Sequence, residues 1–399
     1  MLRNILLLAV CQALMLTATS LTMSSSALVG VQLAPRPVLA TLPLGLTYLA
    51  VMGALIPASL SMRRYGRRVG FATGGLCALL AGAMMSWGIY HHHFLVFSVG
   101  SVFMGFAMAY GQFLRFAAAE VASEDYKSRA ISWVLAGGIV AAFAGPGIAT
   151  LTRQSWQGPA FSASFAALIA VGFSIMLIQL FLKIPPTPSS EKSGPRRSWN
   201  QVYLQPAFLV AVLSGMIAYG SMNLLMVATP LAMDHQGMKF SSTATVIQWH
   251  IVGMFAPSFF TGHLIRRYGV LNIMLIGALM LLVTVAASLS GQSFLHFVVG
   301  LVFLGLGWNF LFVGSTTLLT ETYLPAEKST VQGVNDFLVF SVVAFTAMTS
   351  GLLHHIMGWE ALNLIVMPAI AVAIISILWL KMRGYVAASL HQVQARTDG

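Results

Sequence analysis

Charged side chains are scarce in this chain. Lys, Arg, Asp and Glu make up 8% of its 399 residues, whereas hydrophobic residues make up 58% and the mean hydropathy is +0.83. Soluble domains carry about a quarter charged residues, so this composition excludes an ordinary soluble globule. The chain divides instead into apolar segments of about 20 residues, the length that a membrane-spanning helix requires.

Residue types that carry chemistry are also few. The two cysteines, Cys11 and Cys77, both lie in apolar segments and form neither a disulfide framework nor a zinc pattern. The sequence lacks a Walker-type phosphate loop, which argues against transport driven by ATP. It also lacks paired carboxylates within the apolar segments and any catalytic constellation. We therefore expect a protein that is not an enzyme and has no organic cofactor.

The apolar segments predict an all-α membrane protein with twelve transmembrane helices. The opening segment resembles a signal peptide, but its apolar character continues to Val31, so we expect a retained first span. The gaps between charge clusters place the spans at residues 4–31, 40–62, 69–90, 94–116, 130–152, 160–182, 206–230, 241–264, 270–290, 295–318, 333–353 and 361–381.

Positive charge is distributed unevenly between the predicted loops. If the N-terminus is cytoplasmic, 18 of the 21 Lys and Arg residues lie on the cytoplasmic side, and only Arg36, Arg153 and Lys239 lie on the other. This bias follows the positive-inside rule and predicts that both termini are cytoplasmic. The formal net charge of +11 is therefore explained by the orientation of the chain in a lipid bilayer, and we expect no nucleic-acid partner.

Two landmarks recur at nearly the same offset along the chain. Arg63-Arg-Tyr-Gly66 returns as Arg266-Arg-Tyr-Gly269, 203 residues later, and the stretch 120–127 between a Glu and a Lys returns at 321–328. The repeat indicates duplicated six-helix halves. We expect an N-terminal bundle at 1–182, a cytoplasmic linker at 183–205, a C-terminal bundle at 206–382 and a cytoplasmic tail at 383–399.

Two such halves resemble the major facilitator superfamily over nearly the whole chain. The double-arginine loops match the short basic signature of that family, although Arg63 and Arg266 stand where the family has Asp, and Ser59 replaces a leading Gly. The resemblance implies alternating access around a site near the middle of the membrane. It assigns cytoplasmic gate loops to Arg63, Arg64, Gly66, Arg67, Arg68, Arg266, Arg267 and Gly269.

Two motifs on the seventh and eighth spans suggest a cargo. Met222 and Met226 are four residues apart, as are His250 and Met254, so each pair shares one helix face. Thioethers and an imidazole form a soft donor set that suits Cu(I). These four residues therefore predict a site for copper as transported substrate. The alternative interpretation is that the methionines pack and the histidine bonds across the bundle.

The motif pair resembles the copper importers of the CcoA type, in the copper-and-riboflavin branch of the superfamily. The resemblance implies copper uptake by a monomer across the bacterial inner membrane, for assembly of haem–copper cytochrome oxidase, with a cytoplasmic copper chaperone or chelator as partner. Metal capture at the periplasmic mouth is predicted for His91, His92, His93, Met233, His235 and Met238.

Two further functions stay open. One is transport of riboflavin or another organic solute, for which Tyr110, Phe113, Trp308 and Phe310 offer aromatic rings. The other is a non-transporting sensor or assembly partner. Several polar residues within the spans either line a cavity or bond to neighbouring helices. They are Gln112, Tyr219, Asn223, Gln248 and Asn309.

Overall fold

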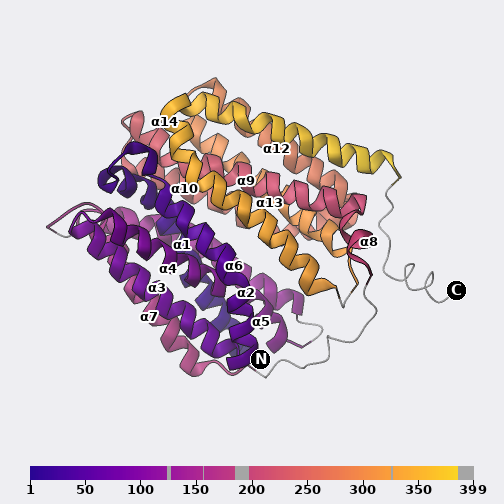
Figure 1. Ribbon diagram of the computed structural model, residues 1–399, viewed down its shortest axis with the longest axis horizontal. Helices are drawn as coiled ribbons and strands as arrows, with labels where there is room; N and C mark the ends of the chain where they lie inside the picture. The colour runs from indigo at the N-terminus through magenta and orange to yellow at the C-terminus, as the bar shows by residue number, and fades with distance from the viewer. Residues whose placement is uncertain (124–126, 156, 185–196, 325–326, 385–399) are drawn as a thin grey trace.

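A computed structural model describes residues 1–123, 127–155, 157–184, 197–324 and 327–384, and all regular structure in these ranges is helical (Figure 1). The first half contains α1 (Leu2–Leu33), the 3-10 turn η1 (Pro37–Leu39), α2 (Leu42–Tyr65), α3 (Arg67–Tyr90), α4 (Phe94–Gly111), α5 (Leu114–Val121), α6 (Lys127–Thr152) and α7 (Ser162–Phe181). The second half contains α8 (Trp199–Tyr203), α9 (Pro206–His235), α10 (Phe240–Phe255), α11 (Ser258–Tyr268), α12 (Val270–Ser290), α13 (Phe294–Thr320) and α14 (Lys328–Met382).

These helices form the twelve predicted spans. Helices α4 and α5 together make the fourth span, and α10 and α11 make the eighth. Helix α14 has 55 residues and contains the last two spans, because Gly358 adopts φ 78° and ψ 178° and breaks the helix. In the described ranges, nine helices are long and apolar enough to cross a membrane, and residues 136–152 of α6 form a shorter apolar helix. The predicted all-helical membrane fold is confirmed.

The helices gather into an N-half (α1–α7) and a C-half (α9–α14), which occupy different parts of the molecule (Figure 1). The turn after each repeated Arg-Arg-Tyr-Gly sequence has the same backbone: Gly66 has φ 87° and ψ 157°, and Gly269 has φ 85° and ψ 147°. Only glycine adopts this conformation without strain. The predicted linker and tail fall largely on residues 185–196 and 385–399, outside the described ranges, so the domain boundaries stay predictions.

The two halves meet at the end of the molecule opposite the linker, which we call the distal end. Thr41, before α2, donates a hydrogen bond through Oγ1 to the carbonyl of Met348 on α14 at 3.3 Å. The rings of Phe161 and Phe240 lie 4.9 Å apart across the halves. The guanidinium of Arg153 lies 5.1 Å and 5.3 Å from the centres of these rings. Backbone, aromatic and cation–π contacts therefore hold the halves together at this end.

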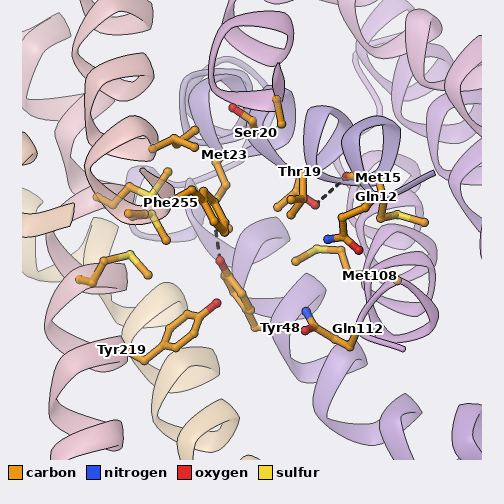
Figure 2. Close-up of a pocket in the computed structure, with 17 residues that line it drawn as sticks. Gln12, Met15, Thr19, Ser20, Met23, Tyr48, Met108, Gln112, Tyr219 and Phe255 are labelled. Carbon is orange, nitrogen blue, oxygen red and sulfur yellow. Dashed lines mark hydrogen bonds between the residues drawn. The ribbon is translucent and has the colours of Figure 1, made fainter. Parts of the chain in front are cut away.

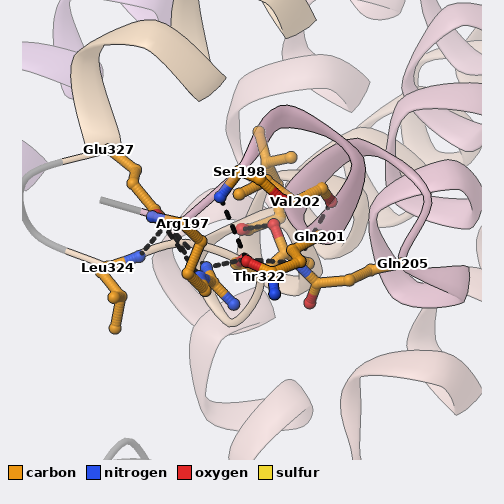
Figure 3. Close-up of polar contacts among 9 residues, drawn as sticks. Arg197, Ser198, Gln201, Val202, Gln205, Thr322, Leu324 and Glu327 are labelled. Carbon is orange, nitrogen blue, oxygen red and sulfur yellow. Dashed lines mark hydrogen bonds and ion pairs between the residues drawn. The ribbon is translucent and has the colours of Figure 1, made fainter. Parts of the chain in front are cut away.

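At the opposite end, the linker end, an ion pair fixes the chain where it enters the C-half (Figure 3). Arg197 Nη2 lies 2.6 Å from Glu327 Oε2, and the Arg197 backbone N–H donates to Oε1 at 2.7 Å. The N–H of Leu324 also donates to Glu327, and Arg197 donates to the Thr322 carbonyl at 2.8 Å. The ion pair, here called the latch, therefore ties the C-half end of the linker to the segment before α14.

The latch has a defined pH dependence. Burial alone raises the pKa of the Glu327 carboxyl, but hydrogen bonds from Arg197 and from the backbone of Leu324 outweigh it, so the pKa lies below its ordinary value of 4.5. A carboxyl with a lowered pKa stabilises the fold above its ordinary pKa, and that stability is lost as the pH falls through the folded-state value.

We therefore expect Glu327→Gln to lower the melting temperature of the purified protein at pH 7 by about 2–4 °C. The difference from wild type should shrink as the pH falls through the Glu327 pKa. Glu120→Gln is the matched control, because Glu120 pairs with Arg67 at a more exposed position and should change the melting temperature less. Equal effects of the two substitutions at pH 7 would contradict the latch.

Candidate functional site

A cavity lies between the two halves, among α1, α2, α4, α6, α9 and α10 (Figure 2). Its empty volume is about 710 Å³, counted to its open mouth. The part of it that a water-sized sphere can occupy is about 100 Å³, which is below the roughly 300–1,000 Å³ of typical small-molecule sites. One wall, here called the N-wall, includes Gln12, Thr19, Ser20, Tyr48, Met108 and Gln112. The facing wall, here called the C-wall, consists of Tyr219, Met222, Met226, Ile251, Met254 and Phe255.

Helices α1 and α9 each present one stripe of side chains to the cavity. On α1 the stripe includes Gln12, Thr19 and Met23, which are spaced by seven and four residues and so share a face. On α9 it includes Met222 and Met226. These two methionines stand 203 residues after Thr19 and Met23, the offset of the internal repeat. Corresponding helices of the two halves therefore contribute corresponding positions to the site.

A break between α10 and α11 shapes the C-wall. Pro257 stands at the break and has no backbone N–H, so the carbonyl of Gly253, four residues earlier, has no helical donor. Asn309 of α13 donates through Nδ2 to the Met254 carbonyl at 2.7 Å and to Ser258 Oγ at 2.7 Å. Its Oδ1 accepts a hydrogen bond from Thr261 at 2.7 Å. Asn309 thus spans the break and fixes Met254 at the cavity.

Several polar groups in the cavity wall have no hydrogen-bond partner among the residues that the structure describes. They are the side chains of Gln12, Gln112 and Tyr219 and the buried hydroxyl of Ser20. Tyr48 donates to the sulfur of Met23 at 3.4 Å. An unpaired polar group in a site shielded from water costs about 1–3 kcal/mol unless a ligand or water satisfies it. The cavity is therefore suited to a solute that forms hydrogen bonds.

Aromatic rings support the C-wall from behind. The Tyr219 ring lies edge-on to Trp308 at 5.4 Å and to Phe312 at 5.3 Å, and these two rings stack on each other at 5.1 Å. Trp308, which the sequence suggests as a stacking platform, packs behind Tyr219 and is not a lining residue. Tyr48, Tyr219 and Phe255 instead present the aromatic surface to the cavity.

The predicted copper ligands do not all reach the cavity. Met222, Met226 and Met254 line it, whereas His250 is not among the lining residues and is fully buried. His250 Nδ1 lies 2.7 Å from the Leu301 carbonyl oxygen on α13. A carbonyl can only accept a hydrogen bond, so Nδ1 carries the proton and Nε2 keeps a free lone pair. No partner of Nε2 is found among the described residues.

The position of His250 has a counterpart in the N-half. Thr47 on α2 donates through Oγ1 to the Ser101 carbonyl on α4 at 3.0 Å. Thr47 precedes His250 by 203 residues, and Ser101 precedes Leu301 by 200. In each half, a hydrogen bond from a side chain to a carbonyl therefore joins corresponding helices: α2 to α4 in the N-half and α10 to α13 in the C-half. We call this contact the helix joint.

A glycine accompanies the helix joint in each half. A Cβ added to Gly105 would lie 2.2 Å from the Thr47 carbonyl oxygen, and one added to Gly305 would lie 2.4 Å from that of His250. Both distances are shorter than any real contact of a Cβ atom. The glycines thus allow the backbones to approach closely, as small residues commonly do between membrane helices.

The residues predicted to capture metal lie at the distal end. The rings of His91 and His93 pack on Trp87 at 4.5 Å and 5.5 Å. Met233 is fully buried, whereas His235 is exposed. In the described part of the chain, no group of three or more His, Cys, Asp or Glu side chains is placed to hold a metal ion. Metal capture here stays a prediction.

The arginines of the predicted gate loops contact their own half. Arg67 forms two hydrogen bonds to the Glu120 carboxylate, at 2.5 Å and 3.1 Å. Arg68 donates to the Leu180 carbonyl at 3.2 Å. The side chain of Arg63 lies outside the part of the chain that the structure describes. Arg67 and Arg68 thus connect helices at the linker end of the N-half. The part of the loop arginines in gating stays a prediction.

A family model described as the Major Facilitator Superfamily matches residues 8–256 and 211–389. The chain belongs to the major facilitator superfamily. Its members are transporters, so this chain is a multi-pass membrane transporter. The solved structure of a D-xylose–proton symporter is similar over 94% of this chain and 96% of its own, with a TM-score of 0.74 and 12% identity. The nucleoside transporter NupG is similar over 94% and 99%, with a TM-score of 0.69 and 12% identity. These two likenesses support the fold alone.

Curated relatives are similar to this chain in sequence as well. The riboflavin transporter RfnT of Brucella anthropi is 37% identical over 388 residues, which cover 96% of this chain and 98% of that protein. The MFS-type transporter YdeG of Bacillus subtilis is 28% identical over 364 residues, covering 85% and 83%. Thus the superfamily is established, whereas the narrower resemblance to copper importers stays a prediction.

Sequence reasoning missed part of this transporter's site. Gln12, Thr19 and Ser20 interrupt the apolar first span and line the cavity, and their spacing on one helix face is the one sequence signal that could have pointed to them. Of the polar residues singled out from the sequence, Gln112 and Tyr219 do line the cavity. Asn223 instead donates to the Val343 carbonyl at 3.0 Å, and Asn309 spans the helix break. Gln248 is half-buried and is not a lining residue.

Proposed function

We propose that this protein carries riboflavin, or a closely related flat heteroaromatic solute, across a bacterial inner membrane. The observation that carries the proposal is the near-full-length similarity to a riboflavin transporter, which extends through both halves. The similarity covers 96% of this chain, so the compared region takes in the helices that form the cavity.

The composition of the cavity supports this proposal. Riboflavin joins a flat ring system, apolar at one edge and rich in hydrogen-bonding groups at the other, to a chain of hydroxyls. The cavity offers the rings of Tyr48, Tyr219 and Phe255 as aromatic surfaces. The amides of Gln12 and Gln112 offer both donors and acceptors, and no residue in the described ranges competes for them.

Alternating access accounts for the movement of the solute. The distal end is held shut by Thr41 against α14 and by Arg153 over Phe161 and Phe240. A solute in the cavity of this state would therefore leave toward the linker end, which the charge distribution predicts to be cytoplasmic. When these distal contacts separate, the cavity opens to the other side, so a solute loaded there can be released at the linker end when the transporter returns to this state.

Copper is the second candidate cargo, and one observation favours it. Six methionines, from both halves, line the same cavity: Met15, Met23, Met108, Met222, Met226 and Met254. Thioethers bind Cu(I) and have little affinity for hard cations. With this cargo, a cytoplasmic copper chaperone or chelator would receive the ion. Methionine is also a common apolar lining for organic ligands, so these side chains suit either solute.

Uptake of both solutes, measured side by side, tests the proposal. The gene is expressed in a bacterial strain that can neither synthesise nor import riboflavin, and uptake of labelled riboflavin and of copper is followed in the same cells. We expect growth on low riboflavin and saturable riboflavin uptake, with copper uptake at the background of the empty vector. Copper uptake without riboflavin uptake would reverse the order of the two candidates.

A further inference from the structure

The hydrogen-bonding side chains of the cavity come mainly from one half of the transporter. Gln12, Thr19 and Ser20 lie on α1, Tyr48 lies on α2, and Gln112 follows α4. The facing wall consists of thioethers, Ile251 and Phe255, with Tyr219 as its polar member. In Figure 2, Gln12, Met108 and Gln112 lie on one side of the cavity, and Tyr219 and Phe255 lie on the other. The site is therefore polar on the N-half side and mainly apolar on the C-half side.

Resting on the riboflavin proposal, we infer that Gln12 and Gln112 together recognise the imide edge of the flavin ring. The C-wall then holds the opposite, methyl-bearing edge. An imide presents a carbonyl, an N–H and a second carbonyl in a row. A carboxamide offers one accepting oxygen and two donated hydrogens, so two carboxamides can accept from the N–H and donate to both carbonyls.

In the described ranges, the side-chain amides of Gln12 and Gln112 are free to bind a solute. Neither amide forms a hydrogen bond to another side chain or to a carbonyl in the described ranges, and both are part-exposed to the cavity. Gln179, by contrast, is a buried glutamine of the N-half that donates to Cys11 and to the Ile175 carbonyl, and it does not line the cavity. Gln179 has the contacts of a structural amide, whereas Gln12 and Gln112 have the contacts expected of a binding amide.

The C-wall complements this arrangement. Met222, Met226 and Met254 place flexible, polarisable thioethers opposite the amides, and Phe255 adds a ring. Such side chains contact apolar surface favourably and accept no strong hydrogen bond. A flavin bound in the reverse orientation would face its imide toward a wall whose one hydrogen-bonding side chain is Tyr219, so most of the imide groups would lack partners, which is costly in a shielded site. The two walls therefore specify one orientation of the ring.

Methylation of the imide nitrogen of riboflavin tests the inference. N3-methylriboflavin keeps the ring and the hydroxyl chain but lacks the imide hydrogen. Binding of both compounds to purified protein is measured by quenching of flavin fluorescence. Wild type should bind riboflavin at least tenfold more tightly than the N3-methyl compound, because a site built around a hydrogen bond rejects the analogue that lacks it.

Two variants assign this selectivity to the glutamines. Gln12→Leu and Gln112→Leu should each weaken riboflavin binding about tenfold, and the variant that removes the acceptor of the imide N–H should reduce the preference over the N3-methyl compound to below threefold. Gln248→Leu serves as the matched control, since Gln248 is half-buried and does not line the cavity, so the same change of side chain there should keep the full preference. The ratio of two affinities in one preparation does not depend on the fraction of protein that is folded.

The outcomes separate this inference from the proposed function. Riboflavin binding with equal affinity for the N3-methyl compound, or an unchanged preference in both glutamine variants, would overturn the role of the amides and leave riboflavin transport intact. Absence of riboflavin binding to folded wild type would overturn both. Loss of preference in the Gln248→Leu control as well would also refute the assignment, because the effect would then not belong to the two cavity glutamines.

Discussion

Replacement of Asn309 by leucine is expected to abolish solute transport. Asn309 makes three hydrogen bonds of 2.7 Å, to the Met254 carbonyl, Ser258 Oγ and Thr261 Oγ1, and is fully buried. Leucine leaves the carbonyl and the Ser258 hydroxyl without this partner, which costs about 2–4 kcal/mol in total. The break between α10 and α11 then loses its support, and Met254 and its neighbour Phe255 shift in the cavity wall.

Uptake in cells and the melting temperature of purified protein check this expectation. Asn272→Leu is the matched control. Asn272 also forms two hydrogen bonds of 2.7 Å, to the Tyr268 carbonyl and Lys381 Nζ, but at an exposed position. Water replaces those bonds, so the control should change stability by less than about 0.5 kcal/mol and keep uptake. Normal uptake by Asn309→Leu would show that the break does not need this support.

Replacement of His250 by threonine is expected to leave riboflavin transport close to wild type and to remove any copper transport. The N-half makes the equivalent helix joint with Thr47, so a hydroxyl at position 250 can replace the imidazole as donor to the Leu301 carbonyl. A threonine hydroxyl is a poor ligand for Cu(I). The change therefore separates a structural role of His250 from a role as metal ligand.

Parallel uptake of the two solutes by wild type and His250→Thr is the measurement. Copper uptake that survives the change would exclude His250 as a necessary ligand, whereas loss of riboflavin uptake in folded protein would contradict a purely structural joint. Thr47→Val removes the hydroxyl from the N-half joint at nearly constant volume. It should lower stability by about 1 kcal/mol and not alter the choice of cargo.

The fold follows from the sequence because its main determinants are local. Each span needs about 20 apolar residues, and clusters of arginine and lysine separate the spans. The repeat around Gly66 and Gly269 also predicts two similar halves, since only glycine forms that turn without strain. The helix break after Phe255 is harder to predict from the sequence. Pro257 marks its position, but Asn309, on another helix, determines how it is stabilised.

The site is only partly predictable, because its residues depend on how the helices are rotated. Met222 and Met226 stand out as a spaced pair of soft ligands, and they do line the cavity. Gln12 and Ser20 do not stand out, since a polar residue in a span bonds to a neighbouring helix as readily as it faces a cavity. His250 attracts attention as an ionisable group in a span, yet packing directs it toward α13 and away from the cavity.

The separation of polar and apolar walls has a consequence for the energy barrier of transport. Rocking changes distances between the halves and leaves distances within each half nearly constant. A solute whose hydrogen bonds all go to the N-wall keeps those bonds while the C-wall moves past it. The contacts exchanged during the movement are then dispersion contacts with thioethers and a phenyl ring, each worth only about 0.1–0.2 kcal/mol per atom pair. The loaded transporter can thus change state without breaking a hydrogen bond to its cargo.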